Sequence, residues 1–209
     1  MVGHVVAIGH SYARGRRGMN RLLGNAVFLV PRSPVRVLFY EGTATSASRN
    51  GVRAAIEQVA SERGRSWDER FAQVGAVTDQ LADVDVFVVL PQQAGTDTEL
   101  RDLGVRWRRA LDVFVHTGGV VVLLDGGGSH AGTWQILHAA GLLDAAGRVD
   151  VTGDSVSVVA PGDAVVLGVP IEYRAERRSV RFEGTSATAV VTHAQGPVVL
   201  HRVVLPGGS

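Results

Sequence analysis

The residues best suited to chemistry stand together in one short segment, residues 125–130, which reads DGGGSH. It places a carboxylate, a hydroxyl and an imidazole close together, and such a group could support acid–base or nucleophilic chemistry. The same side chains could instead satisfy loop backbone groups and helix ends. The three glycines could bring backbone amides toward a ligand, or they could form a tight strand-to-helix turn with nothing bound. Both interpretations stay open from the sequence.

Buried strands must position this segment. Three runs are almost entirely apolar, namely residues 35–40 (VRVLFY), 84–90 (VDVFVVL) and 120–124 (VVVLL). Runs that are apolar on both faces are typical of buried parallel strands. We therefore expect these three strands to be adjacent, parallel and buried.

Helical patterns alternate with these strands. The first covers about residues 47–63, with Ser46 or Ser48 as its N-cap, and the last covers about residues 133–140. The longest starts at an N-cap formed by Thr96 or Asp97 and runs to about His116. Its apolar residues predict a buried stripe, formed by Leu100, Leu103, Val105, Trp107, Leu111, Phe114 and Val115. The alternating order predicts a three-layer, flavodoxin-like α/β fold with a parallel sheet.

The sequence pattern changes after about Val149, where the alternation of apolar runs and helical patterns ends. Short Val-rich pieces separated by Gly, Asp and Pro predict additional antiparallel strands in the C-terminal third. No hinge-like linker separates the two parts, so residues 1–209 are expected to form a single domain. Residues 1–30 either pack on this domain as an appended strand and helical turn or belong with a neighbouring chain.

The topology predicts where a ligand would bind. In open α/β sheets, ligands lie beyond the carboxyl ends of the parallel strands. That rule selects a candidate ligand-binding set, consisting of Glu41, Gln92, Asp125, Gly126, Gly127, Gly128, Ser129 and His130. Because two carboxylates border this set, a small neutral polar ligand is favoured over an anion. The histidines are dispersed without H-x-H or H-x-x-x-H spacing, so neither a metal nor a cofactor is expected.

The composition excludes several classes of protein. The chain has no Cys, and all 21 basic residues are Arg. Disulfide frameworks, thiolate zinc sites, cysteine nucleophiles, lysine Schiff bases and Walker-type phosphate loops are therefore excluded. A net charge of +1 gives no case for nucleic acid or an anionic membrane as partner, and a homo-oligomer or protein partner stays open. No apolar run approaches the roughly 18 residues of a membrane span, and the chain start is a poor signal peptide, so a cytoplasmic protein is expected.

One segment resembles a known family. Residues 110–143 (ALDVFVHTGGVVVLLDGGGSHAGTWQILHAAGLL) resemble the central segment of the class I glutamine amidotransferase-like superfamily, and are closest to its trehalose-utilisation-protein-like branch. In that family, a helix with a Gly-Gly stop leads into an apolar strand and then a sharp glycine turn. The resemblance covers roughly residues 35–205 and implies the same fold.

The chain departs from this family at the catalytic residues. Active members carry a Cys on the glycine turn and a late His-x-Glu pair, whereas here Ser129 is the only nucleophile-type side chain of the turn. His193 is followed by Ala194 and Gln195, and His201 by Arg202 and Val203. The resemblance therefore implies a non-catalytic binding or interaction module and no glutamine amidotransferase activity. One alternative is a hydrolase that uses Ser129 with His130 or a late His, and another is one piece of a larger assembly whose opening strand completes a partner's sheet.

Overall fold

The three apolar runs form adjacent, parallel, buried strands, which confirms the prediction. In the computed structural model, β4 (Val86–Val89) pairs in parallel with β2 (Val35–Tyr40) on one side and with β5 (Val120–Leu124) on the other. Every residue of β4 and β5 is buried. The structure describes residues 1–209 except 15, 129, 152, 185–187, 195 and 208–209.

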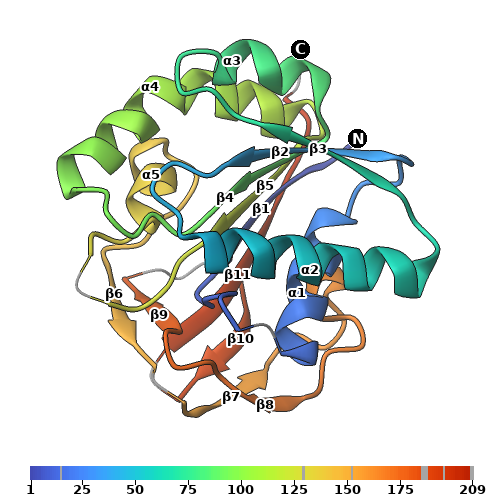
Figure 1. The fold of residues 1–209 in the computed structure, drawn as a ribbon, viewed down its shortest axis with the longest axis vertical. Coiled ribbons are helices and arrows are strands. Elements are labelled where there is room, and N and C mark those ends of the chain that lie inside the picture. The colour runs from blue at the N-terminus through green and yellow to red at the C-terminus, as the bar shows by residue number, and fades with distance from the viewer. Residues whose placement is uncertain (15, 129, 152, 185–187, 195, 208–209) are drawn as a thin grey trace.

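The opening strand lies inside the same sheet (Figure 1). β1 (Gly3–Ile8) pairs in parallel with β5 along one edge and antiparallel with β11 (Gly196–Val204) along the other. Both edges of β1 are therefore paired within this chain. The alternative in which the opening strand completes a partner's sheet is wrong for this reason.

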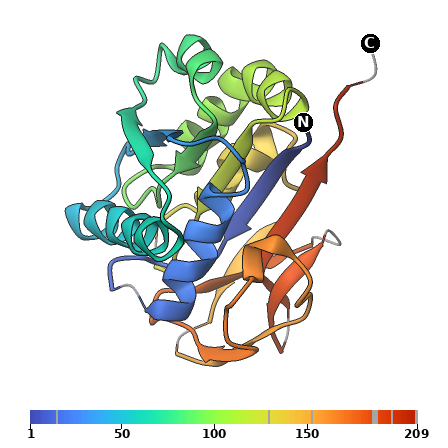
Figure 2. The ribbon, with the colours of Figure 1, turned by 90° about the vertical axis from the view of Figure 1, so that its right-hand side faces the viewer.

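The remaining strands confirm the change from parallel to antiparallel pairing. The nine-stranded sheet has the order β3-β2-β4-β5-β1-β11-β10-β7-β8, and β6 pairs with β9 in a separate two-stranded sheet. Their bounds are β3 (Trp67–Phe71), β6 (Gly147–Asp150), β7 (Ser155–Val158), β8 (Glu172–Arg174), β9 (Val180–Glu183) and β10 (Ala189–His193). Figure 2 shows the β-rich C-terminal part gathered at one end of the molecule, with both termini toward the other end.

Helices cover both faces of the parallel strands, so the fold is a three-layer α/β structure of flavodoxin-like type. Side chains alternate along each strand: Val122 of β5 packs in the core on one face, and Leu123 packs in the core on the other. The first face carries α1 (Arg17–Val27), α2 (Ser46–Arg63) and the 3₁₀ helix η2 (Ala164–Val166). The second carries α3 (Val77–Gln80), the 3₁₀ helix η1 (Leu81–Asp83), α4 (Asp97–His116) and α5 (Trp134–Ala139).

Two details of the helices differ from the sequence predictions. Thr45, and neither Ser46 nor Ser48, caps α2, because Thr45 is extended and its hydroxyl accepts a hydrogen bond from the Ser48 amide at 3.2 Å. Val105 does not belong to the buried stripe of α4 and is 59% exposed. It lies two positions before the buried Trp107, which places it on the far side of the helix. Thr96 caps α4 as expected, in a capping box with Glu99.

Within the described part of the chain, the helices include none that is both long and apolar enough to span a membrane.

Candidate functional site

The carboxyl ends of β1 and β5 form the part of the sheet edge where a crevice is expected. The helix after β1 covers one face of the sheet and the helix after β5 covers the other, so the two chains diverge at this point. The Asp125 amide donates to the Ile8 carbonyl oxygen at 2.9 Å, which places Asp125 directly beside the end of β1. The predicted turn therefore begins at the expected edge of the sheet.

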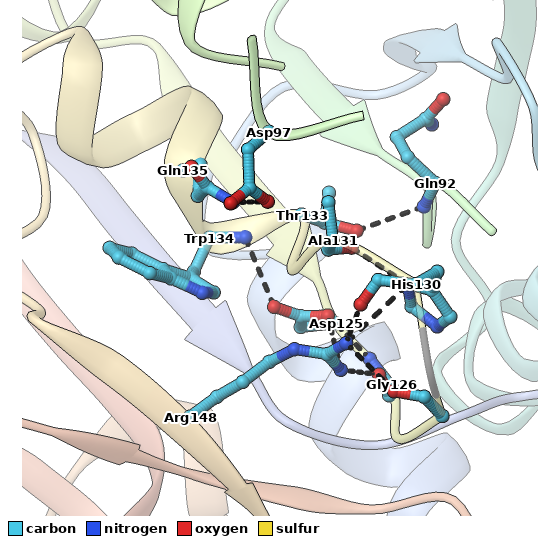
Figure 3. Close-up of polar contacts among 11 residues, drawn as sticks. Gln92, Asp97, Asp125, Gly126, His130, Ala131, Thr133, Trp134, Gln135 and Arg148 are labelled. Atoms are coloured by element: carbon cyan, nitrogen blue, oxygen red, sulfur yellow. Dashed lines mark hydrogen bonds and ion pairs between the residues drawn. The ribbon is translucent and has the colours of Figure 1, made fainter. Parts of the chain in front are cut away.

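Asp125 is fully buried and occupied by contacts within the chain (Figure 3). Its carboxylate accepts hydrogen bonds from the amides of Gly126 at 2.8 Å and Trp134 at 3.0 Å. The Arg148 guanidinium lies 3.4 Å from the same group. Burial raises the pKa of Asp125, while Arg148 and the backbone hydrogen bonds act in the opposite direction. The Asp125 carboxylate thus joins the glycine turn to the start of α5.

Arg148, which comes from β6, holds the glycine turn from its other side. Its guanidinium donates to the carbonyl oxygens of Gly126 and His130, the latter at 2.6 Å. The Gly127 amide donates to the carbonyl oxygen of Arg178 at 2.7 Å. The amides of Gly126 and Gly127, which could have bound a ligand, are therefore already paired within the chain.

Gln92 and Glu41 take different positions at this edge. The buried Gln92 is joined to the turn region through its amide, which donates to the Thr133 hydroxyl at 2.9 Å. Its side chain accepts from the Thr43 amide at 2.8 Å and donates to the Leu90 carbonyl oxygen at 2.7 Å. Gln92 therefore bridges the loops after β2 and β4.

Glu41 faces the helix that follows β2. Its carboxylate is 2.9 Å from the Arg53 guanidinium and 3.5 Å from that of Arg49, both of which belong to α2. No hydrogen bond or ion pair within the described residues joins it to Asp125 or His130. Gln92 thus shares the edge with the glycine turn, whereas Glu41 borders it from the side of α2.

His130 is partly buried, and Ser129 lies outside the described residues. The His130 Nδ1 donates to the Ala131 carbonyl oxygen at 2.7 Å. The glycines provide the close approach that the turn requires: a Cβ on Gly127 would lie 2.7 Å from the Asp150 carboxylate. Gly128 has φ +130, a conformation that L residues rarely adopt.

A second polar cluster at this edge was missed by the sequence analysis. His10 follows the end of β1, and its ring nitrogens lie 2.7 Å from the Ser179 hydroxyl and 2.7 Å from the Tyr173 hydroxyl. His10 and Ser179 are both 0% exposed. Burial lowers the pKa of His10 to about 3, so the ring is neutral and donates to one hydroxyl while accepting from the other. The position of His10 just after a strand was the signal that could have identified it.

The segment of residues 176–180 covers the crevice between β1 and β5. The Val180 amide donates to the Gly9 carbonyl oxygen at 2.7 Å, after β1, and the Arg178 carbonyl oxygen accepts from Gly127, after β5. The Ser179 carbonyl oxygen accepts from the Val151 amide at 2.8 Å. The chain itself therefore occupies the place where this topology normally holds a ligand.

A further histidine pair joins β1 to β11. The His201 Nδ1 donates to the Asp163 carboxylate at 2.8 Å, and its Nε2 lies 2.9 Å from the His4 Nδ1. His201 is buried, and burial together with His201 lowers the pKa of His4. Among the described residues, no serine or threonine hydrogen-bonds to this pair, and no three His, Asp or Glu side chains are grouped as a metal would require.

Comparison with known proteins gives similarities of backbone only. No protein-family model matches the chain, and no curated protein matches it in sequence. A Listeria monocytogenes EGD-e protein described provisionally as peptidase E is 13% identical, covers 58% of each chain and has a TM-score of 0.38. A peptidase from an acI-B1 Actinobacterium is 12% identical and has a TM-score of 0.38. The match covers 60% of this chain and 55% of the peptidase chain.

A third solved structure covers more of the chain. A ThuA-like protein from Bacteroides uniformis ATCC 8492, also described provisionally, is 12% identical and has a TM-score of 0.46. The match covers 78% of this chain and 69% of that protein. The matches thus extend over little more than half of the two peptidase chains. None of these similarities assigns a role to a residue of this chain.

Proposed function

We propose that this chain is a non-catalytic binding module of the amidotransferase-like type, closest to the trehalose-utilisation-protein-like branch. The observation that carries the proposal is the closure of the β1–β5 crevice by residues 176–180. His10 and Asp125, the imidazole and carboxylate nearest the strand ends, are both 0% exposed and already hydrogen-bonded within the chain. A general base must reach the proton that it removes, and neither group is accessible to a substrate.

The absence of a thiol supports the same proposal. The sequence has no Cys, so the amidotransferase nucleophile is missing. A small neutral polar ligand over the turn from Asp125 to His130, bordered by Glu41 and Gln92, stays a prediction. An interaction with a second copy or another protein is compatible with this module.

A serine-dependent hydrolase is the second candidate, and one distance favours it. The Ser179 hydroxyl is within hydrogen-bond reach of His10, as a nucleophile and base would be. The third group on His10 is the neutral phenol of Tyr173, because burial raises the Tyr173 pKa further above its usual value. No carboxylate among the described residues is hydrogen-bonded to His10, so the cluster lacks the acid that orients the base of a triad.

Hydrolysis assays distinguish the two candidates. Purified protein is incubated with glutamine to follow ammonia release and with p-nitrophenyl acetate to follow ester cleavage, beside a heat-unfolded sample of the same preparation. The binding module predicts rates equal to those of the unfolded sample. Turnover by the folded protein that disappears in Ser129→Ala or Ser179→Ala would overturn the proposal and identify the nucleophile.

A further inference from the structure

A large groove lies at the amino edge of the parallel strands, opposite the Asp125 turn. Its walls come from the segment that leads into β2, from α3 and η1, from the second half of α4 and from the Thr117–Gly119 connection into β5. Its volume is about 910 Å³, which is within the range of small-molecule sites. Neither of the polar clusters described above contributes to it.

Apolar side chains form the floor of this groove. Leu81, Val84 and Phe114 belong to the core on the α4 face and line the groove with the 4–7% of their surface that stays exposed. Val113 of α4 also lines the groove and is 54% exposed. An apolar body placed here would therefore remove hydrocarbon surface from water on both sides of the contact.

The rim of the groove carries an excess of positive charge. Arg32, Arg36, Arg106 and Arg109 line it, against a single carboxylate, that of Asp85. The Asp85 carboxylate is 2.7 Å from the Arg32 guanidinium and 3.2 Å from that of Arg36. Burial opposes ionisation of Asp85, but hydrogen bonds from Arg36 prevail and lower its pKa. Arg32 and Arg36 thus already share an anion.

Arg106 and Arg109, in contrast, have no carboxylate partner within the described part of the chain. They stand on adjacent turns of α4, both exposed, and among the described residues neither has a hydrogen bond or an ion pair. Guanidinium groups bind carboxylates through paired N–H donors. The two free guanidinium groups can bind the charged end of an amphipathic anion, and the apolar floor beside them can bind its hydrocarbon part.

We propose that this groove binds a small organic anion with an apolar body, of the fatty-acid type, whose carboxylate pairs with Arg106 and Arg109. The apolar body lies over Leu81, Val84 and Phe114. The excess of positive charge disfavours a cation, and the apolar residues that line the groove favour a hydrocarbon body over a nucleic-acid strand. The inference rests on the proposed function only in treating the chain as a binding module, and it concerns the opposite edge of the sheet.

Decanoate is the probe, measured by isothermal titration calorimetry below its micelle concentration. The variant Arg106→Gln/Arg109→Gln is expected to bind decanoate about tenfold more weakly or worse, as loss of charged hydrogen bonds implies. The matched control is Arg70→Gln/Arg202→Gln, which removes the same charge from two exposed arginines outside the groove. This control is expected to bind within about twofold of wild type, since distant exposed charges are largely screened.

A second variant and a second probe test whether the ligand binds in the groove itself and whether its negative charge is required. Val113→Glu places a carboxylate on the groove wall and is expected to abolish binding, while its exposed position leaves folding intact. Decyltrimethylammonium has the same chain length and the opposite charge, and no binding is expected. The proposal is overturned if decanoate gives no heat with wild type, if both double variants weaken it equally, or if the cation binds as well. Sedimentation with phosphatidylserine vesicles without decanoate binding would also overturn it, in favour of a membrane surface.

The two proposals fail separately. If no variant and no wild-type protein binds decanoate, the hydrolysis assays still decide whether the chain is catalytic. If the hydrolysis assays are positive, the calorimetry still decides whether the groove binds decanoate.

Discussion

The His10 imidazole and the Ser179 hydroxyl are 2.7 Å apart, although 169 positions separate the two residues in the sequence. The contact joins the end of β1 to the segment that enters β9, and Tyr173 completes the cluster on the other ring nitrogen. Both polar groups are removed from water and satisfied by one another. The cluster therefore fixes the segment that closes the crevice, and its titration should be visible in the stability of the protein.

The buried His10 predicts an acid-sensitive fold. In the unfolded chain, His10 takes up a proton below about pH 6.5, whereas burial delays this in the folded protein to about pH 3. The unfolded state binds more protons between these values, so the free energy of unfolding falls as the pH drops through this window. The slope contributed by His10 is about 1.4 kcal/mol per pH unit.

The measurement is urea unfolding at a series of pH values between 6.5 and 3.5, for wild type and for His10→Gln. Glutamine can still donate and accept but does not titrate, so its stability should fall less steeply with acid. The other titratable groups, including His4, are the same in both proteins. Parallel curves for the two proteins would show that His10 is not buried in the neutral form.

The Asp125 carboxylate is predicted to be structural. Asp125→Ala leaves the amides of Gly126 and Trp134 without their acceptor and removes a charge partner from Arg148. We expect a loss of about 3–5 kcal/mol in the free energy of unfolding. The control Asp144→Ala removes an exposed carboxylate and should change stability by less than about 0.5 kcal/mol. Equal effects of the two substitutions in a urea titration would contradict the assigned role.

Leu123 tests the assignment of β5 as a core strand. It is 0% exposed, and Leu123→Ala should cost about 2–5 kcal/mol, as expected for a buried leucine. Leu205→Ala is the matched control, because Leu205 is 71% exposed and should change stability little. A cost below about 1 kcal/mol for Leu123→Ala in denaturant unfolding would mean that β5 is not part of the core.

The sequence pattern is clearest for strands that are buried on both faces. Val120–Leu124 is buried on both faces, so its sequence is apolar throughout and its assignment was direct. β3 shows the opposite case: it is the edge strand WDERF, with four of five residues exposed, and it carries no apolar pattern to detect. The opening strand was recognised as a strand, but its pairing with β5 and β11 depends on contacts that are distant in sequence.

The sequence predicts only those residues of the candidate site that directly follow a strand. Asp125 and Gln92 follow strands, and the rule for open α/β sheets places them at the carboxyl edge. Arg148 and residues 176–180 reach the same edge from β6 and from the segment before β9, and no local spacing marks them. The closure of the crevice, which decides between an open site and a structural one, is therefore a property of the tertiary fold.

The central claim is that the protein presents no activated serine, and covalent labelling tests it most directly. The folded protein is treated with a fluorophosphonate, which reacts with serine nucleophiles activated by a base, and its intact mass is measured beside an active serine hydrolase in the same tube. The account predicts that the hydrolase is fully labelled and that this protein keeps its unmodified mass. A single stoichiometric adduct that is lost in Ser129→Ala or Ser179→Ala would contradict the account.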